Sequence, residues 1–137
     1  MKFSKILLLI CLVFLLSGIV CAGENSTKIT FEGVNFNIPD SFNQSGDVSD
    51  YDKLGSEGVR CLYQNGESES IEIIVVHDWM GMSLDDLHVD GAVKGVINSH
   101  EGWKYSQNGL YYFSYVDDDS GIIVGSQNQT LISEIIV

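Results

Sequence analysis

Cysteine and proline are scarce in this chain of 137 residues. Of the three cysteines, Cys11 and Cys21 lie in an apolar N-terminal segment, so Cys61 is alone in the remainder. A lone cysteine excludes an internal disulfide framework, and we interpret Cys61 as a buried core thiol. Pro39 is the only proline, and no internal repeat or proline-rich linker divides the chain. The part that follows the apolar segment is therefore expected to be one domain.

Basic residues are also few. Seven lysines and arginines stand against 19 acidic residues, which gives a formal net charge of −12. Lys2 and Lys5 lie in the N-terminal segment, so residues 23–137 carry five basic and 19 acidic residues, a net charge of −14. Such a surface repels phosphate backbones and anionic membranes and attracts cations or basic partners. We therefore expect no nucleic-acid partner, and membrane contact only through the N-terminal segment if it is retained.

Common catalytic patterns are absent as well. The sequence has no GxSxG serine elbow, no HExxH helix, no zinc-type Cys/His spacing and no phosphate-binding glycine loop. The acidic run 117–121 resembles a calcium loop, which needs a ligand at its fifth position and glutamate at its twelfth. Those positions hold Gly121 and Asn128. We interpret the run as a hairpin turn and predict neither a metal nor a cofactor.

The N-terminus has the layout of a secretory signal peptide. A short basic start, an unbroken apolar run (6–16) and a small, mildly polar stretch follow one another. We predict cleavage ahead of Gly23, which makes residues 1–22 a signal peptide and residues 23–137 a single extracytoplasmic domain, secreted or held at the cell surface. Two alternatives stay open: the apolar run is retained as a membrane anchor, or Cys21 carries a lipid.

Alternating apolar and polar residues, separated by glycine turns, predict an antiparallel sheet. Strands are expected at 28–31, 34–38, 59–64, 70–77, 103–106, 110–116 and 122–126. The hairpin around Asn65-Gly66 poses a conflict over register. A two-residue turn pairs Cys61 with Ser70, whereas burying the apolar residues on one face requires an odd loop, with Cys61 beside Ile71. We predict the odd loop, because burial usually decides register.

Residues 83–100 show the pattern of an amphipathic helix. Ser83 and Asp86 have the spacing of a capping box, and apolar residues recur at helical spacing after them. We therefore predict an α+β fold, a single antiparallel β-sheet with this one main helix packed across one face. The apolar stretch 131–137 is left open between a strand and a helix capped by Asn128 or Thr130.

Candidate site residues lie between the strand 70–77 and the predicted helix. His77 and Asp78 stand together there and carry the alternative hypothesis of a small hydrolase or metal-dependent enzyme. The loop residues Trp79, Met80 and Met82 either bind a partner or, as we favour, cover the open edge of the core. Without a catalytic pattern, the favoured hypothesis is a non-catalytic exported module that binds a protein or envelope component through a sheet face or edge.

Three N-x-S/T sequences mark candidate N-glycosylation sites. Their asparagines are Asn25, Asn43 and Asn128. All three fall in expected loops or at an end of the chain, so we predict that they lie on the surface.

Three segments carry a resemblance to a known group of proteins. They are GVNFNIPDSF, GLYYFSYV and LISEIIV, which follow the leader in that order. With these segments the chain resembles the small exported proteins of unknown function found in methanogenic archaea. The resemblance implies a surface or pseudoperiplasmic location, and it implies no activity and no functional residue.

Overall fold

The computed structural model describes residues 24–52, 56–78 and 80–137. The predictions made for residues 1–22, for Cys21 and for Trp79 lie outside the described residues. Within the described ranges, no helix has the length and apolar character needed to cross a membrane.

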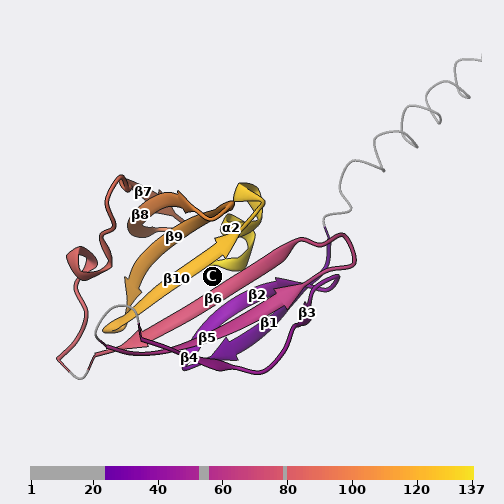
Figure 1. The fold of residues 1–137 in the computed structure, drawn as a ribbon, viewed down its shortest axis with the longest axis horizontal. Coiled ribbons are helices and arrows are strands. Elements are labelled where there is room, and N and C mark those ends of the chain that lie inside the picture. Colours follow the sequence, from indigo (N-terminus) through magenta and orange to yellow (C-terminus); the bar gives the residue numbers. More distant parts are fainter. Residues whose placement is uncertain (1–23, 53–55, 79) are drawn as a thin grey trace, which may run out of the picture.

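Two antiparallel sheets form the domain (Figure 1). The strands are β1 (Ser26–Phe31), β2 (Val34–Pro39), β3 (Asn43–Gln44), β4 (Ser49–Tyr51), β5 (Glu57–Gln64), β6 (Ser70–His77), β7 (Val93–Ile97), β8 (His100–Gln107), β9 (Leu110–Asp117) and β10 (Ser120–Ser126). β1 pairs with β2 in a two-stranded sheet. The other strands form an eight-stranded sheet in the order β3-β5-β6-β10-β9-β8-β7, with β4 also paired to β5. A 3₁₀ helix, η1 (Leu84–Leu87), and one short α-helix, α2 (Gln129–Ile135), complete the described part.

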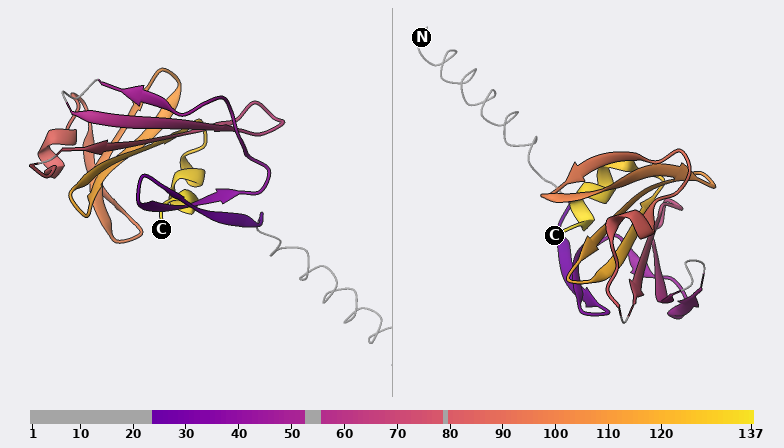
Figure 2. Two further views of the ribbon diagram at one scale, coloured as in Figure 1. Left: turned by 90° about the horizontal axis from the view of Figure 1, so that it is seen from below. Right: turned by 90° about the vertical axis from the view of Figure 1, so that its left-hand side faces the viewer.

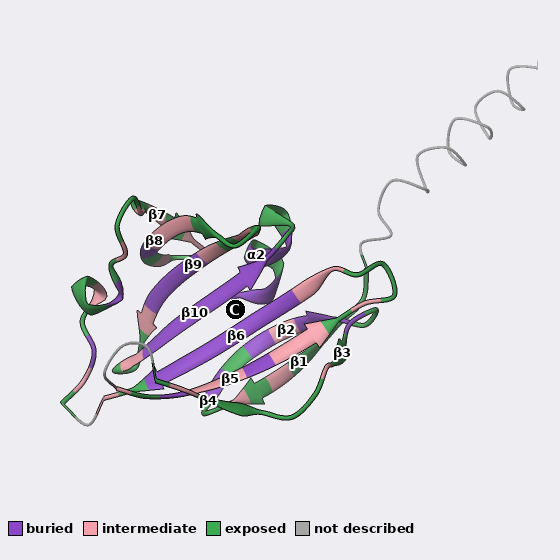
Figure 3. Ribbon diagram, in the orientation of Figure 1, coloured by how far each residue is buried: buried purple, intermediate pink, exposed green. Residues whose placement is uncertain are grey.

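The main core lies between the large sheet and a cover made by α2 and the β1–β2 hairpin. Figure 2 shows both covering elements on the same side of the sheet, and a β-bridge joins Phe36 in β2 to Ile136 just after α2. β6 and β10 run through the middle and are buried along most of their length (Figure 3). Because a fully buried Val, Ile or Phe side chain contributes about 1.5–3 kcal/mol, this layer is the main source of stability.

A smaller apolar cluster lies on the opposite face of the large sheet. Met82 and Leu87, from the segment around η1, pack there against Ile74 and Ile123 of the central strands. Gly121 permits this close approach, since a Cβ at that position would lie 2.8 Å from the sulfur of Met82. The segment between β6 and β7 therefore covers part of the second face.

The β5–β6 hairpin has the predicted odd loop. Gln64 pairs with Ser70, so five residues, 65–69, make the turn. The side-chain oxygen of Asn65 holds that turn by accepting from the backbone N–H groups of Glu67 and Glu69, each at 3.0 Å. Cys61 lies beside Ile73 rather than Ile71, a shift of two residues that keeps the same side chains on the core face.

The helix predicted over 83–100 is wrong. Its capping box forms, because the backbone N–H and the hydroxyl of Ser83 both donate to Asp86 Oδ2 at 2.8 Å, and these bonds lower the pKa of the Asp86 carboxyl. The box closes only the single turn of η1. Gly91 then adopts a left-handed φ of +84°, which a helix cannot continue through, and the β-branched residues after it form β7.

The predicted fold class is corrected accordingly. The described chain is mostly β, with two sheets in place of a single sheet, and no main helix crosses a sheet face. The one α-helix among the described residues is the C-terminal stretch that the sequence had left open. Asn128 caps it, since its side-chain oxygen accepts from the backbone N–H of Thr130 at 3.1 Å.

Candidate functional site

The two candidate catalytic residues, His77 and Asp78, contact different partners. The Asp78 carboxylate accepts a hydrogen bond within its own loop, from the backbone N–H of Met80 at 2.9 Å. His77 ends β6, and its Nδ1 lies 3.1 Å from Ser120 Oγ. Its Nε2 lies 3.5 Å from Glu32 Oε2. The structure therefore does not join His77 and Asp78 into one site.

The row Ser120–His77–Glu32 superficially resembles a hydrolytic triad. The serine lies within reach of the imidazole, but the 3.5 Å gap to Glu32 is too long for the hydrogen bond that orients a catalytic histidine. The side chain of His77 is 45% exposed, so water competes for both contacts. We interpret the row as a polar contact between the ends of three hairpins. Among the described residues, no group of three His, Cys, Asp or Glu side chains is placed to hold a metal ion.

The residues of the apolar loop before η1 differ in burial. Met82 is buried in the second cluster, which agrees with its interpretation as a cover, whereas Met80 is exposed. The sequon asparagines Asn25, Asn43 and Asn128 are all exposed, in the segment before β1, in β3 and at the cap of α2. Their modification stays a prediction.

The most distinctive surface feature is the β7 edge of the large sheet. β7 is the last strand in the order, and no described strand pairs with its outer side. Val93 and Val96 in it are each 63% exposed, which is high for apolar residues in a strand. An unpaired strand edge with exposed apolar side chains is a template for pairing with another chain.

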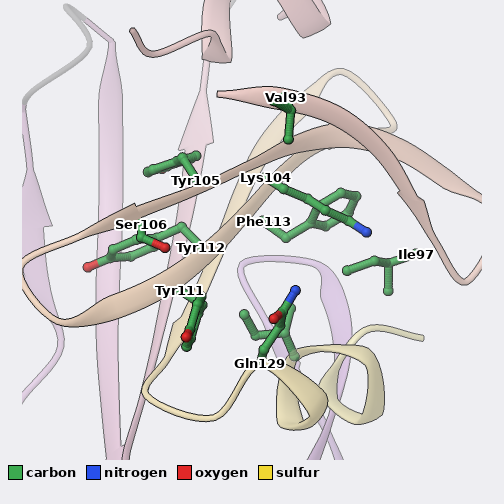
Figure 4. Close-up of a pocket in the computed structure, with 10 residues that line it drawn as sticks. Val93, Ile97, Lys104, Tyr105, Ser106, Tyr111, Tyr112, Phe113 and Gln129 are labelled. Atoms are coloured by element: carbon green, nitrogen blue, oxygen red, sulfur yellow. The ribbon is translucent and has the colours of Figure 1, made fainter. Parts of the chain in front are cut away.

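An apolar pocket of about 260 Å³ opens beside this edge. Val93 and Ile97 of β7 line it together with Lys104 of β8, Phe113 of β9 and Gln129 of α2. Figure 4 shows these side chains around a hollow between the curled strands and α2. The pocket lies on the face of β7 that Val93 and Ile97 share. Every second side chain of a strand added to β7 would therefore lie at the mouth of the pocket.

Two of the basic residues, Lys94 and Lys104, lie at this edge. Lys94 contacts Glu101 at 3.6 Å and lies 5.3 Å from the centre of the Trp103 ring. Lys104 reaches into the pocket across Gly95, and it forms no ion pair with a described residue. In a chain with 19 acidic residues, the pocket therefore offers an unmatched local cation.

Comparisons with known proteins give no match. No family model fits the chain, and neither a curated protein nor a solved structure matches it. The resemblance to exported archaeal proteins therefore stays a prediction.

The sequence analysis did not predict this strand edge, because the residues of β7 also fit the helical pattern of 83–100. One signal was available, since Val93, Val96 and Ile97 are β-branched and follow Gly91. The contacts of His77 had no sequence signal, because Glu32, in the β1–β2 turn, and Ser120, at the start of β10, are both far from it along the chain.

Proposed function

We propose that the protein is a non-catalytic binding module that accepts an extended segment of another protein at the β7 edge. The observation that carries the proposal is the outer side of β7, with which no described strand pairs. It has two exposed valines, one of which, Val93, lines an apolar pocket. Main-chain hydrogen bonds to a strand edge supply affinity in this mode of recognition, and pockets for alternate side chains supply specificity.

The chemistry of the edge defines the partner segment. Val93, Ile97 and Phe113 favour an apolar side chain in the pocket. Lys104 favours a carboxylate next to it, since opposite charges across an interface select partners and orient them. The expected ligand is therefore an extended peptide in which apolar residues and an acidic residue alternate. In line with the signal-peptide layout, we place this partner outside the cytoplasm, in the envelope or beyond it.

Site-specific photo-crosslinking tests the proposal. A photo-reactive amino acid replaces Val96 in one variant and Val48 in a matched control. Val48 is 47% exposed and lies in the loop between β3 and β4, at the other end of the sheet. We expect crosslinks from position 96 to one defined segment of a second protein, and none from position 48.

A synthetic peptide of the crosslinked segment then gives the affinity. Val93→Asp replaces an apolar side chain of the pocket with a carboxylate, which would repel the acidic residue of the segment, and should weaken binding at least about tenfold, which corresponds to about 1.4 kcal/mol. Peptide binding should also slow amide hydrogen exchange in β7. Crosslinks only to a second copy of this chain, or equal crosslinking from both positions, would contradict the proposal.

A further inference from the structure

A second hollow lies on the opposite face of the large sheet from the β7 pocket, and Tyr105 and Tyr112 belong to the lining of both. It measures about 460 Å³, and its floor is formed by Ile74 of β6 and Ile123 of β10. β4 and β5 line it at one side, and the β8–β9 hairpin lines it at the other. We call it the tyrosine cleft, after Tyr51, Tyr105 and Tyr112, which all line it.

Glycines fix two of these tyrosines in place. Tyr112 lies against Gly125 on the neighbouring strand, where any Cβ would collide with its ring. On the other side, a Cβ at Gly58 would lie 2.7 Å from the carbonyl oxygen of Tyr51. Tyr105 stacks on Tyr112 with ring centres 5.2 Å apart. The aromatic lining is therefore ordered before any ligand arrives.

A hydrogen-bonded network neutralises Arg60, the one basic group among the described residues that line the cleft. Arg60 donates from Nε and Nη2 to Glu72 Oε2, at 3.0 and 2.7 Å. The hydroxyl of Tyr112 donates to Glu72 Oε1 at 3.3 Å. Both oxygens of the buried Glu72 carboxylate are thus bonded, and the charge of Arg60 is matched.

The charge that remains on the described lining of the cleft is negative. Asp50 and Asp52 line its rim, are exposed, and form no ion pair with a described residue. Burial, followed by the nearby charge of Glu72, raises the pKa of Tyr112, so this phenol stays neutral and protonated. Anions are therefore repelled from the cleft, whereas a cation finds carboxylates at the rim and aromatic rings inside.

We propose that the tyrosine cleft binds a small organic amine, with its alkyl chain against the tyrosines and an ammonium group at Asp50 and Asp52. The carboxylates attract the charge, and the rings add cation–π attraction to an alkylammonium group. A bare metal ion would find no group of three carboxylate, histidine or cysteine ligands among the described residues. The tyrosine cleft opens on the opposite face of the sheet from the β7 pocket, and this proposal does not depend on the proposed function.

Titration of the ¹⁵N-labelled full chain with putrescine tests this proposal. Butane-1,4-diol, which has the same carbon chain without charge, and Mg²⁺, which has charge without a carbon chain, are the matched probes. We expect saturable shifts of the amide signals of Asp50, Tyr51 and Tyr112 with putrescine. Neither control probe should reproduce them.

Variants then assign the binding energy. Asp50→Asn together with Asp52→Asn should weaken putrescine about tenfold, because two exposed ion pairs contribute about 1–2 kcal/mol in all. Tyr51→Leu should weaken it about threefold through loss of a cation–π contact. Glu134→Gln, at an exposed position of α2, is the charge control and should change affinity less than twofold. Equal binding of the diol, equal shifts with Mg²⁺, no putrescine binding, or an equal loss in the Glu134 variant would overturn the proposal.

Discussion

The two edges of the large sheet are built in opposite ways. The edge beside β5 is divided between β3 and β4, which have only two and three residues and are separated by a polar loop. It also carries the sequon at Asn43. The other edge is β7, a continuous strand of five residues with two exposed valines. Short, interrupted strands discourage pairing with other chains, so the first edge is closed and the second is left open.

The two edges also differ in what surrounds a glycine in each of them. Gly58 in β5 lies under Tyr51 of β4 and is blocked by backbone, whereas Gly95 in β7 is covered only by the flexible side chain of Lys104. The closed edge therefore depends on a rigid contact, and the open edge does not. Four measurements, taken from the largest expected effect to the smallest, examine this difference.

Gly58→Val should destabilise the protein the most. The new side chain would meet the carbonyl oxygen of Tyr51, so β4 would have to move away from β5, at a cost of about 2–3 kcal/mol. Urea unfolding measures the change. Gly66→Ala is the control, because a Cβ there meets no atom within 4 Å, and its effect should stay within about 0.5 kcal/mol. Equal stability of the two variants would show that β4 does not close its edge rigidly.

Asn98→Ala should have the next largest effect and should act at the open edge. The side-chain amide of Asn98 donates to the carbonyl oxygens of Ser133 and Ile136, at 2.7 and 2.6 Å, and so ties the β7–β8 turn to α2. Losing both bonds should cost about 1–2 kcal/mol in thermal or urea unfolding. Asn98→Gly separates this loss from the strain of its left-handed φ of +47°. If the glycine variant regains the full stability, the hydrogen bonds contribute nothing.

Cys61 gives a pH-dependent test on the closed side of the sheet. Burial raises the pKa of its thiol to about 11, above its usual value of 9.0. The folded state therefore binds the thiol proton more tightly than the unfolded state does. The contribution of the protonated thiol to stability is complete below pH 9 and is lost as the pH rises from 9 to 11. The stability difference between the unmodified protein and Cys61→Ala should shrink by about 1 kcal/mol over this interval. A constant difference would mean that the thiol is accessible to water in β5.

Gly95→Val should have the smallest effect and should stabilise. The side chain of Lys104 can move aside, and valine is favoured in a strand over glycine by up to about 1 kcal/mol. We expect a gain of about 0.5 kcal/mol in urea unfolding, with β7 still able to accept a partner strand. A loss comparable to that of Gly58→Val would show that both edges are packed rigidly and would remove the contrast between them.

Local patterns in the sequence predicted most of the strands but not their assembly. The hairpins at Glu32-Gly33 and Asn65-Gly66 form where turn residues and alternation agree. In 83–100 two local signals conflicted: the capping box at Ser83 favoured a helix, and the β-branched residues after Gly91 favoured a strand. Pairing with β8 decided the outcome, and such long-range pairing cannot be read from local spacing.

The candidate sites were harder to predict than the fold. The β7 pocket requires α2 to lie beside β8 and β9, and the tyrosine cleft joins β4 to the β8–β9 hairpin across the whole sheet. Arg60, Glu72 and Tyr112 look like unrelated strand residues until the order β5-β6-β10-β9 brings them together. Strand order was among the properties that the sequence left undetermined.

The pairing of β6 with β10 has a kinetic consequence. From β5 to β7, every other pair of neighbouring strands in the large sheet is consecutive in sequence and forms a hairpin with a short loop. By contrast, β6 pairs on one side with β10, the last strand of the chain, and cannot complete its pairing before β10 is present. Until then the apolar run of β6 has a free side, and closing the long loop between the two strands is the slow step in folding. During synthesis, the half-made chain is therefore most prone to aggregate at β6, before β10 has emerged.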